Sequence, residues 1–470
     1  MLKNALLFRR IAGNWQHSRT VGRRFLSSSN GAGANVLQTL RDRGLVSQVS
    51  QPESVLENKL VSGEKVGLYC GADPTAKSLH LGNLLPLMVL LHFYIAGHDV
   101  YTLVGGATGQ VGDPSGRKTE RAGMADWQRL ENVSKIQGQL RGFFESGLAY
   151  YKHKTASVEH QYGRATHTNN YDWWHDMRML DFLALYGRHI RVQSMLNRDS
   201  VSSRLGSKEG IGFNEFTYQI LQAFDYYHLN KTHGVTVQVG GNDQWGNITA
   251  GIDLINRVGC TAQNQPFGLT VPLLTTSSGE KFGKSAGNAV FIDPHLTKPY
   301  ELYQYFIQVS DDDVEKLLKT FTLLPLEHIK ETIDAHASMA HERGAQRLLA
   351  REVVDLIHGM GSSNDAEIVS EVLFGAHDLG SSATELIRLF QDANILYTCS
   401  RNLSLEQIIT QVAKCSKSEA RRKLKQGSIY VGPRRTKVAE NKDDVAQYLI
   451  DGQVLILRVG KQKCYVIEVK

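Results

Sequence analysis

Two lysines three positions apart lie in a loop rich in glycine and serine, Gly279–Ser285. Lys281 and Lys284 could neutralise the negative charge that develops on a departing pyrophosphate. The loop is not a P-loop, because that motif would need a glycine where the chain has Ser278. The pattern therefore predicts either a phosphate-binding loop or an ordinary solvated basic loop.

A second anion-binding pattern follows an apolar run. The segment Tyr69–Thr75 ends a predicted strand, and His80–Asn83 opens a predicted helix. Free backbone N–H groups at such a helix start point toward a bound phosphate. Thr75, His80 and Asn83 can each add a donor. The alternative is an ordinary strand–loop–helix turn in which the histidine caps the helix.

The segment Gly240–Asn247 directly follows another buried strand. Its paired glycines allow the backbone to approach a ligand closely. Asp243 could hold ribose hydroxyls and Gln244 could contact the polar end of a substrate, although a tight turn capped by the aspartate is the plainer interpretation. No G-x-G-x-x-G fingerprint stands at a strand–helix turn, which argues against a dinucleotide cofactor.

A polar stripe on a largely apolar helix is the most informative pattern. Within Phe216–Asp225, the residues Tyr218, Gln222 and Asp225 are spaced i, i+4 and i+7, and therefore share one helix face. The other positions are mostly apolar and should be buried. Buried polar groups need partners, so the stripe is satisfied either within the chain or by a small polar molecule.

These patterns require a scaffold that brings the ends of several strands together. Strands alternating with helices predict an α/β fold with a parallel sheet, whose sites lie at the carboxyl ends of the strands. The helical, charge-mixed stretch 112–211 should be an insertion between the two halves of this sheet, and 300–391 should be helical throughout. Strands are expected at 66–70, 100–104, 235–239 and 271–274, and a helix at 84–96.

The last segment, 403–470, differs in composition and carries 14 Lys and Arg against 7 Asp and Glu. Ser416 and Glu419 have capping-box spacing and should open a cationic helix that stops at Gly427. Strands are expected at 429–431, 454–459 and 464–469. The segment reads as a small α+β module with a basic helix.

The first 34 residues carry a positive charge as large as the net charge of the whole chain. Residues 1–34 hold six Lys and Arg and no acid, which equals the formal net charge of +6 of all 470 residues. An Arg- and Ser-rich, acid-free segment with helically spaced apolar residues is typical of a mitochondrial transit peptide. The alternative is a disordered basic tail. The remainder is neutral, so its charge does not indicate nucleic-acid binding.

Five cysteines without a CxxC pair favour a reducing compartment over a disulfide scaffold or a structural zinc site. The length suggests two to four domains. No apolar stretch approaches the ~20 residues of a membrane span, so membrane insertion is not expected.

Taken in order, the motifs resemble those of one family. His80–Asn83 (HLGN) and Lys281–Ser285 (KFGKS) resemble the HIGH and KMSKS signatures of class I aminoacyl-tRNA synthetases. Four further motifs narrow the resemblance to the tyrosyl-tRNA synthetase family: YCGADPT, GDPSG (Gly112–Gly116), FTYQILQAFD and GGNDQWGN. The presequence narrows it further, to the mitochondrial form of that family. The resemblance covers about residues 40–470.

This resemblance implies a domain order. A transit peptide over 1–34 would precede a Rossmann-like catalytic domain over 35–299, with its insertion at about 113–212. An α-helical anticodon-side domain over 300–395 and an S4-like RNA-binding domain over 403–470 would follow. The activity implied is a tyrosine–tRNA ligase, with tyrosine, ATP and tRNA(Tyr) as substrates.

The resemblance also implies a tyrosine pocket. Tyr69 and Asp225 would hold the phenolic hydroxyl of the substrate. A pocket built to hydrogen-bond that hydroxyl leaves its own groups unpaired when phenylalanine binds, and this family is the standard case of such rejection. The ammonium group of the substrate would be held by Asp113, Tyr218 and Gln222.

Gln244 would lie near the reacting carboxylate of tyrosine. Asp73 would help to fix ATP, together with Gly82 and Asn83. Mg²⁺ would arrive with ATP, and no ligand cluster indicates a tightly held metal. The adenylate ribose would be surrounded by Cys70, Gly71, Gly241 and Asp243.

Charge stabilisation would come from side chains of three loops. Thr75 and His80 would contact the triphosphate in the transition state. A substrate carboxylate is ionised at pH 7 and needs no general base, so positioning and charge can supply the catalysis. The departing pyrophosphate would be stabilised by Lys281, Lys284, Arg117 and Arg121.

Two positions depart from the family pattern. Asn83 stands where a second histidine is commoner, although its amide can still donate, and Phe282-Gly283 replaces Met-Ser while keeping both lysines. The insertion is the dimer surface of the family, so a homodimer in the mitochondrial matrix is expected. Contacts to tRNA are expected from Arg421, Arg422, Lys423, Lys425, Arg434 and Arg435.

Three other classes of protein compete with this interpretation. A tryptophanyl-tRNA synthetase would share the architecture but would not need an aspartate at 225 beside Tyr69. A non-catalytic RNA-binding protein derived from a synthetase should have eroded site residues, whereas every catalytic position here is chemically competent. A general nucleotidyltransferase would not need the stripe of Tyr218, Gln222 and Asp225.

Overall fold

The computed structural model describes two compact units. The first contains 35–296 together with 309–345, and the second contains 297–308 together with 346–470. The expected transit peptide lies outside the described residues. Within the chain, the structure describes 35–117, 119, 123–155, 161–206, 210–285, 288–375, 380–438, 445–460 and 463–470.

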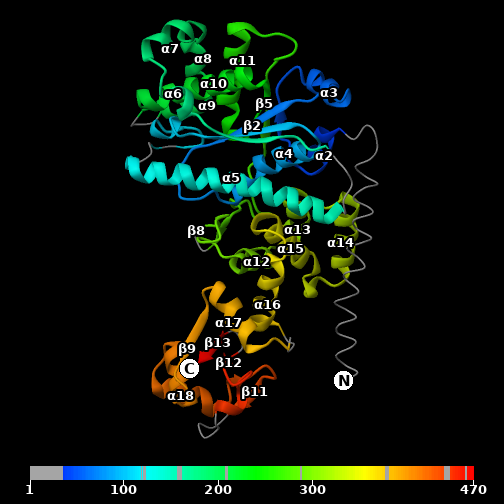
Figure 1. Cartoon of the computed structure of the whole chain (residues 1–470), viewed down its shortest axis with the longest axis vertical. Coiled ribbons are helices and arrows are strands. Elements are labelled where there is room, and N and C mark those ends of the chain that lie inside the picture. Colours follow the sequence, from blue (N-terminus) through cyan, green and yellow to red (C-terminus); the bar gives the residue numbers. More distant parts are fainter. Residues whose placement is uncertain are drawn as a thin grey trace. The chain divides into compact units, whose positions relative to one another are not determined.

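A six-stranded sheet in the order β1-β6-β5-β2-β3-β4 forms the centre of the first unit (Figure 1). Strands β2 to β6 run parallel to their neighbours, and β1 pairs antiparallel with β6 at one edge. The expected α/β fold with a parallel sheet is confirmed. The strands are β1 (Gln48–Val49), β2 (Gly67–Ala72), β3 (Asp99–Val104), β4 (Ala165–Asn169), β5 (Val235–Gly241) and β6 (Phe267–Val271).

Helices cover both faces of this sheet, with α10 and α11 on one face and α4 and α5 on the other (Figure 1). Strand β5 is buried over almost its whole length, as its apolar sequence requires of a strand covered on both sides. Among the described helices, none combines the length and the apolar character needed to cross a membrane. The helices are α2 (Val36–Asp42), α3 (Glu53–Val61), α4 (Leu84–Ile95), α5 (Asp126–Thr155), α10 (Phe213–His233) and α11 (Trp245–Gly259).

The connections of the sheet reverse direction at β2. The chain passes from β2 to β3 and β4 on one side, and then returns to place β5 on the other side of β2. The loops after β2 and β5 therefore leave the sheet side by side at its carboxyl edge. Such a switch point is where open parallel sheets bind ligands, and the loops Ala72–His80 and Gly241–Trp245 both start there.

Two of the expected elements differ from the structure. The stretch 112–211 is not purely helical, because β4 pairs with β3 and extends the sheet. Its sequence, ATHTN, is half-buried and polar at a sheet edge and lacks the apolar alternation of a strand. The strand expected at 271–274 lies at 267–271 and ends before Pro272, which cannot donate to the ladder. The stretch also contains α6 (Tyr171–Trp174), α7 (Met179–Leu185), α8 (Val192–Leu196) and α9 (Asp199–Leu205).

The first unit ends with two short strands and two helices. Strands β7 (Lys284–Ser285) and β8 (Asn288–Ala289) pair antiparallel. Helix α13 (Asp311–Phe321) packs against α4, and α14 (Leu326–Ser338) packs against α13. The helical domain expected over 300–395 is therefore divided between the two compact units. Residues 309–345 belong to the unit of the parallel sheet, and the others belong to the second unit.

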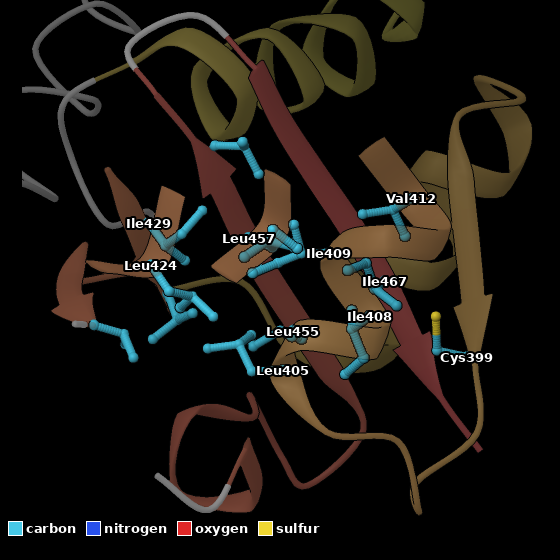
Figure 2. Close-up of a cluster of buried hydrophobic side chains, with 14 of the residues drawn as sticks. Cys399, Leu405, Ile408, Ile409, Val412, Leu424, Ile429, Leu455, Leu457 and Ile467 are labelled. Carbon is cyan, nitrogen blue, oxygen red and sulfur yellow. The ribbon is translucent and has the colours of Figure 1, made fainter. Parts of the chain in front are cut away.

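The second unit surrounds a five-stranded sheet in the order β11-β10-β12-β13-β9. Alternate residues of β12 face opposite sides: Leu455 and Leu457 pack against α18 and α19, as Figure 2 shows, and Val454 and Ile456 pack against α16 and α17. The period of two in a strand produces this division. The elements are α12 (Pro299–Ile307), α15 (Gly344–His358), α16 (Ser362–Phe374), α17 (Ala383–Asp392), β9 (Leu396–Cys399), α18 (Leu405–Ala413), α19 (Lys417–Lys425), β10 (Ile429–Val431), β11 (Thr436–Val438), β12 (Val454–Val459) and β13 (Lys463–Val469).

The basic helix of this unit starts and stops where the sequence predicts. The Ser416 hydroxyl accepts a hydrogen bond from the backbone N–H of Glu419, and α19 follows directly. Gly427 takes a left-handed conformation with φ +59° just after the helix, which glycine adopts readily. The expected strands at 429–431, 454–459 and 464–469 correspond to β10, β12 and β13.

Candidate active site

A buried carboxylate lies at one end of the candidate site. Asp225 on α10 is 1% exposed. It accepts hydrogen bonds from Asn170 Nδ2 (2.9 Å), Trp173 Nε1 (2.8 Å) and Trp174 Nε1 (2.7 Å). Burial raises its pKa to about 7, and the three donors oppose that rise. Near neutral pH the group can therefore act as a hydrogen-bond acceptor in a dry environment.

The hydroxyl of Tyr69 lies in the same environment. Tyr69 is on β2 and is 1% exposed, and its ring packs against that of Tyr226 with centroids 5.3 Å apart. Its pKa is raised well above the usual value, first by burial and then by the negative charge of Asp225. The hydroxyl has no hydrogen-bond partner within the described part of the chain. Because buried polar groups are nearly always paired, this group fits a polar atom of a ligand.

A chain of hydrogen bonds extends from Asp225 toward the end of β2. Asn170 Nδ2 also donates to Thr108 Oγ1 (2.9 Å), and Thr108 Oγ1 donates to Asp73 Oδ1 (3.0 Å). The other carboxylate oxygen of Asp73 accepts from the hydroxyl of Tyr218 (2.8 Å). The structure therefore joins Tyr218 and Asp73 directly, although the sequence assigns them to different substrates.

Gly105 explains how the backbone fits beside this chain of hydrogen bonds. A Cβ atom on Gly105 would lie 2.0 Å from Asp73 Oδ1 and 2.5 Å from Thr108 Oγ1. Both distances are shorter than any real contact, so only glycine is compatible with this arrangement. The glycine pair at 105–106 thus serves close approach of the backbone, whereas the sequence shows only that it lacks a dinucleotide fingerprint.

A second polar cluster gathers around Asp113. Gln244 Nε2 donates to Asp113 Oδ2 (2.8 Å), and Gln222 Nε2 donates to Gln244 Oε1 (3.2 Å). Asn247 Nδ2 donates to Gln222 Oε1 (3.0 Å) and to Ser115 Oγ (3.2 Å). The structure therefore brings together three residues assigned from the sequence, Asp113, Gln222 and Gln244. One carboxylate and several amide oxygens suit an ammonium group.

The loops after β2 and β5 form an open, solvated part of the site. Gly71, Thr75 and Asp243 are exposed. Cys70 is buried, and burial raises the pKa of its thiol to about 12, so the thiol is neutral at physiological pH. Gly116, with φ +69°, passes close to Asp243, since a Cβ there would lie 3.6 Å from the aspartate Cβ. This places the end of the GDPSG motif beside the second loop.

His80 is the N-cap of the short 3₁₀ helix η1 (Leu81–Asn83). Its Nδ1 accepts from the backbone N–H of Gly82 (3.0 Å), and Asn83 Oδ1 accepts from the backbone N–H of His80 (3.0 Å). Burial and then the positive charge of Lys281 lower the pKa of His80. A neutral ring that accepts at Nδ1 carries its proton on Nε2, so His80 can donate to a phosphate oxygen.

The two signature motifs lie against each other. The backbone N–H of Leu81 donates to the carbonyl of Val290 (3.0 Å), and Ile292 N–H donates to the carbonyl of Leu79 (3.0 Å). Val290 N–H donates to the carbonyl of Gly283 (2.8 Å). A Cβ on Gly283 would lie 3.4 Å from Leu81 Cβ. Backbone hydrogen bonds therefore place the KFGKS loop directly over the HLGN turn.

Two of the four cations assigned to pyrophosphate have side chains that the structure describes. The side chain of Lys281 is exposed, and no ion pair involves it in the described ranges. Arg117 is also exposed. Arg121 lies outside the described residues, and for Lys284 the structure describes the backbone alone. Their roles toward pyrophosphate remain predictions.

Comparison with known proteins identifies the family. A sequence profile described as "tRNA synthetases class I (W and Y)" matches residues 62–375, more than half of the chain. Over 445 residues the chain is 56% identical to "Tyrosine--tRNA ligase, mitochondrial" of Saccharomyces cerevisiae, covering 94% of this chain and 90% of that protein. The chain belongs to the tyrosyl-tRNA synthetase family. It is also 40% identical to the "Tyrosine--tRNA ligase" of Lactobacillus johnsonii, covering 93% of this chain and 99% of that protein.

Solved structures agree with this assignment to the class I tyrosyl-tRNA synthetases. The C-terminally truncated mitochondrial tyrosyl-tRNA synthetase of Aspergillus nidulans matches with a TM-score of 0.67 and 35% identity, covering 76% of this chain and 99% of that one. The corresponding protein of Coccidioides posadasii matches with a TM-score of 0.65 and 36% identity, covering 78% and 100%. The resemblance drawn from the motifs is confirmed, and so is the fold class.

Within this tyrosyl-tRNA synthetase, the sequence did not indicate several polar residues of the site. They surround the assigned carboxylates and come from the turn after β3, the GDPSG loop, the end of β4 with α6, and the first turn of α11. The signal available was weak, because two asparagines and two tryptophans in Asn169–Trp174 lie in a stretch interpreted as helical. The residues missed are Thr108, Ser115, Asn170, Trp173, Trp174 and Asn247.

The cations expected to contact tRNA fall into two groups in the structure. Arg421 Nε is paired with Glu406 (2.8 Å), and Lys423 Nζ is paired with Glu419 (2.9 Å). Arg435 donates to the carbonyl of Gly375, at the end of α16. Exposed side chains without an ion pair in the described part of this synthetase are those of Arg422, Lys425 and Arg434.

Proposed function

We propose that this chain is a mitochondrial tyrosine–tRNA ligase that forms tyrosyl-adenylate and then charges tRNA(Tyr). The observation that carries the substrate assignment is the pair of Asp225 and Tyr69. A buried carboxylate lies near a buried hydroxyl of β2 that has no hydrogen-bond partner in the described part of the chain. A substrate phenol can donate to the carboxylate and accept from the tyrosine hydroxyl, which satisfies both groups.

In the activation step, a carboxylate oxygen of tyrosine attacks the α-phosphorus of ATP. The bond from that phosphorus to the bridging oxygen breaks, so pyrophosphate leaves and tyrosyl-adenylate remains. The attacking carboxylate is already ionised, and no proton has to be removed. The protein therefore contributes position and charge, with His80 as a neutral donor and Lys281 as a cation at the leaving group.

The ammonium group of tyrosine would lie in the polar cluster around Asp113. Gln222 and Gln244 hold that carboxylate in place by a short chain of hydrogen bonds. Tyr218, whose hydroxyl is engaged with Asp73, would border the same space. Mg²⁺ would enter as the counterion of the triphosphate.

In the second step, a ribose hydroxyl of the 3′-terminal adenosine of tRNA(Tyr) attacks the tyrosyl carbonyl, and AMP leaves. The second unit would bind the tRNA through α19 and the loop before β11. Arg422, Lys425 and Arg434 would contact phosphates, which position RNA without reading its sequence. Charge reversal at Arg422 and Lys425 should weaken aminoacylation and leave pyrophosphate exchange unchanged.

We also propose that the enzyme works as a homodimer in the mitochondrial matrix. Support for the dimer comes from large apolar side chains that are exposed along α7 to the start of α10. Large apolar side chains exposed to solvent in number often belong to an interface. Light scattering should give twice the chain mass. The exposed residues are Met179, Leu180, Leu183, Leu185, Val192, Leu205 and Phe213.

The deciding experiment is amino-acid-dependent ATP–pyrophosphate exchange, with all twenty amino acids tested singly on a chain that starts near Ala34. Exchange with tyrosine alone is expected. Exchange with tryptophan instead would overturn the assignment of Asp225 while leaving the fold intact. A folded protein that binds RNA without any exchange would instead be a non-catalytic RNA-binding protein.

A further inference from the structure

The loop that carries Lys281 is a small hairpin. Phe282 N–H donates to the carbonyl of Leu274 (2.9 Å), and Thr276 N–H donates to the carbonyl of Glu280 (2.8 Å). The turn of this hairpin is Ser277–Gly279, closed by a hydrogen bond from Gly279 N–H to the carbonyl of Thr276 (2.9 Å). Such a short hairpin has too few contacts of its own to be stable alone, so other elements must hold it.

The first turn of α13 holds the turn of the hairpin. Asp313 is 7% exposed, and its Oδ1 accepts from the backbone N–H of Ser277 (2.8 Å). Its Oδ2 accepts from the hydroxyls of Ser277 (3.2 Å) and Ser310 (2.7 Å). Hydrogen bonds to an ionised carboxylate are among the stronger ones in proteins. Both oxygens of one buried carboxylate are thus committed to this turn and the adjoining N-cap.

The same helix contacts the hairpin at two further points. Lys316 Nζ donates to the carbonyl of Thr275 (3.0 Å), and the ring of Phe321 stacks on that of Phe282 with centroids 6.3 Å apart. Positions 313, 316 and 321 share roughly one face of the helix. The helix therefore contacts the hairpin on both sides of Lys281.

Helix α13 is itself fixed at its other end. Arg43, just after α2, is 6% exposed and donates to the carbonyls of Lys319 (3.1 Å), Thr322 (2.8 Å) and Leu324 (2.5 Å). Burial lowers its pKa to about 10, so it is still a cation at neutral pH. A cation at the carboxyl end of a helix is favourable. The helix is anchored at its end and through α4, and it can serve as a rigid support.

We propose that Asp313 is a positioning residue for the activation step, because it holds the hairpin in the conformation that presents Lys281 to the pyrophosphate. The inference rests on the proposed function. Asp313 touches no reacting atom and acts through Ser277 and the hairpin. A misplacement of about 1 Å at a catalytic group can lower a rate by about 100-fold. Asp313 should therefore affect turnover and leave tyrosine binding unchanged.

The competing explanation is a purely structural role for an acid in the first turn of a helix. Asp312 provides the matched control. It lies in the same turn, carries the same charge and is exposed, with no hydrogen bond or ion pair in the described part of the chain. Both aspartates lie in the first turn and favour the helix dipole, so a difference between them reports the buried contacts of Asp313 with Ser277 and Ser310, and the variant of Ser277 separates these two contacts.

The experiment compares Asp313→Ala, Asp313→Asn, Ser277→Ala and Asp312→Ala in the full chain. Tyrosine-dependent pyrophosphate exchange is measured while tyrosine and ATP are varied separately, together with tyrosine binding without ATP. Asp313→Ala should lower kcat about 10- to 100-fold and keep tyrosine affinity within about 3-fold. Asp313→Asn retains one acceptor and should recover part of the loss. Asp312→Ala should match the wild type.

The double variant tests the coupling. Ser277→Ala should lower kcat by a few fold, and it should add no further loss to Asp313→Ala, because the two groups act through one contact. Additive losses, or equal effects of Asp313→Ala and Asp312→Ala, would overturn the inference while leaving the proposed function intact. A wild-type chain without tyrosine-dependent exchange would overturn both. If Asp313→Ala does not fold, Asp313→Asn and Ser277→Ala carry the same test.

Discussion

The candidate site has a phenol end around Asp225 and a phosphate end around Lys281, and the two ends differ in burial and in how their charged groups are paired. At the phenol end, Asp225 is buried and receives three hydrogen bonds from side chains of the same unit. At the phosphate end, Lys281 is exposed and has no ion pair within the described residues, and it lies on a short hairpin that is held by side chains of α13. The carboxylate at the phenol end is therefore already fixed by the fold, whereas the cation at the phosphate end is free to pair with its substrate.

This contrast follows from what each end must do. Discrimination between tyrosine and phenylalanine depends on one hydroxyl, and such a small difference is amplified where water is excluded, because buried groups of the pocket then stay unpaired when that hydroxyl is missing. Stabilising a departing pyrophosphate needs positive charge that is not already neutralised. Four predictions test this division, in order of the expected size of effect.

Asp225→Ala should have the largest effect and should be confined to the phenol end. It removes the acceptor of the substrate hydroxyl and of three side-chain N–H donors of the pocket. We expect kcat/KM for tyrosine to fall about 1,000-fold, with the KM for ATP changed by less than about 3-fold. Exchange kinetics with tyrosine and with phenylalanine measure the loss of discrimination. Equal losses toward tyrosine and ATP would break the phenol assignment, and Asp225→Asn repeats the test if the alanine variant does not fold.

Lys281→Ala should affect only the phosphate end. Removing one group that stabilises transition-state charge typically lowers kcat about 100- to 1,000-fold, so exchange should slow by about 100-fold while the KM for tyrosine stays constant. Lys330→Ala, at an exposed position on α14, is the control for loss of a surface charge. A raised KM for tyrosine with unchanged kcat would contradict this division of the site.

The pH dependence of discrimination should sharpen the comparison. Burial raises the pKa of Asp225 to about 7 in the free protein, and a phenol donates best to the ionised carboxylate. The ratio of kcat/KM for tyrosine over phenylalanine should therefore rise with pH and level off above about pH 7. Below that value it should fall up to about tenfold per pH unit. In Asp225→Asn the ratio should not vary with pH, and a ratio independent of pH in the wild type would contradict the prediction.

The smallest effect is expected at Asn83, where the family more often has histidine. In the structure, its side chain accepts from the backbone N–H of His80, which is a capping role. Asn83→Ala should lower the free energy of unfolding by about 1 kcal/mol and exchange by less than about 10-fold. Denaturant unfolding and exchange kinetics together measure this. A 100-fold loss of exchange would instead show that Asn83 contacts the nucleotide in the transition state.

The sequence was most informative where the chemistry is local. The HLGN turn, the stripe on α10 and the cap at Ser416 each depend on residues within seven positions of one another, and all three were recognised. The strand β4 was missed because an edge strand of polar residues carries little apolar pattern. That error also hid Asn170, Trp173 and Trp174, since β4 leads directly into α6.

The chain by itself determined the motifs, their order along the strands and helices, and hence the family and its chemistry. Only the tertiary structure decided which partners satisfy the site. Asn170 reaches Asp225 across 55 positions, and Ser277 reaches Asp313 across 36. Local periodicity reports which face of an element is buried, but it carries no signal of which distant polar group will meet it there. Those pairings arise when the sheet places separate loops at one edge.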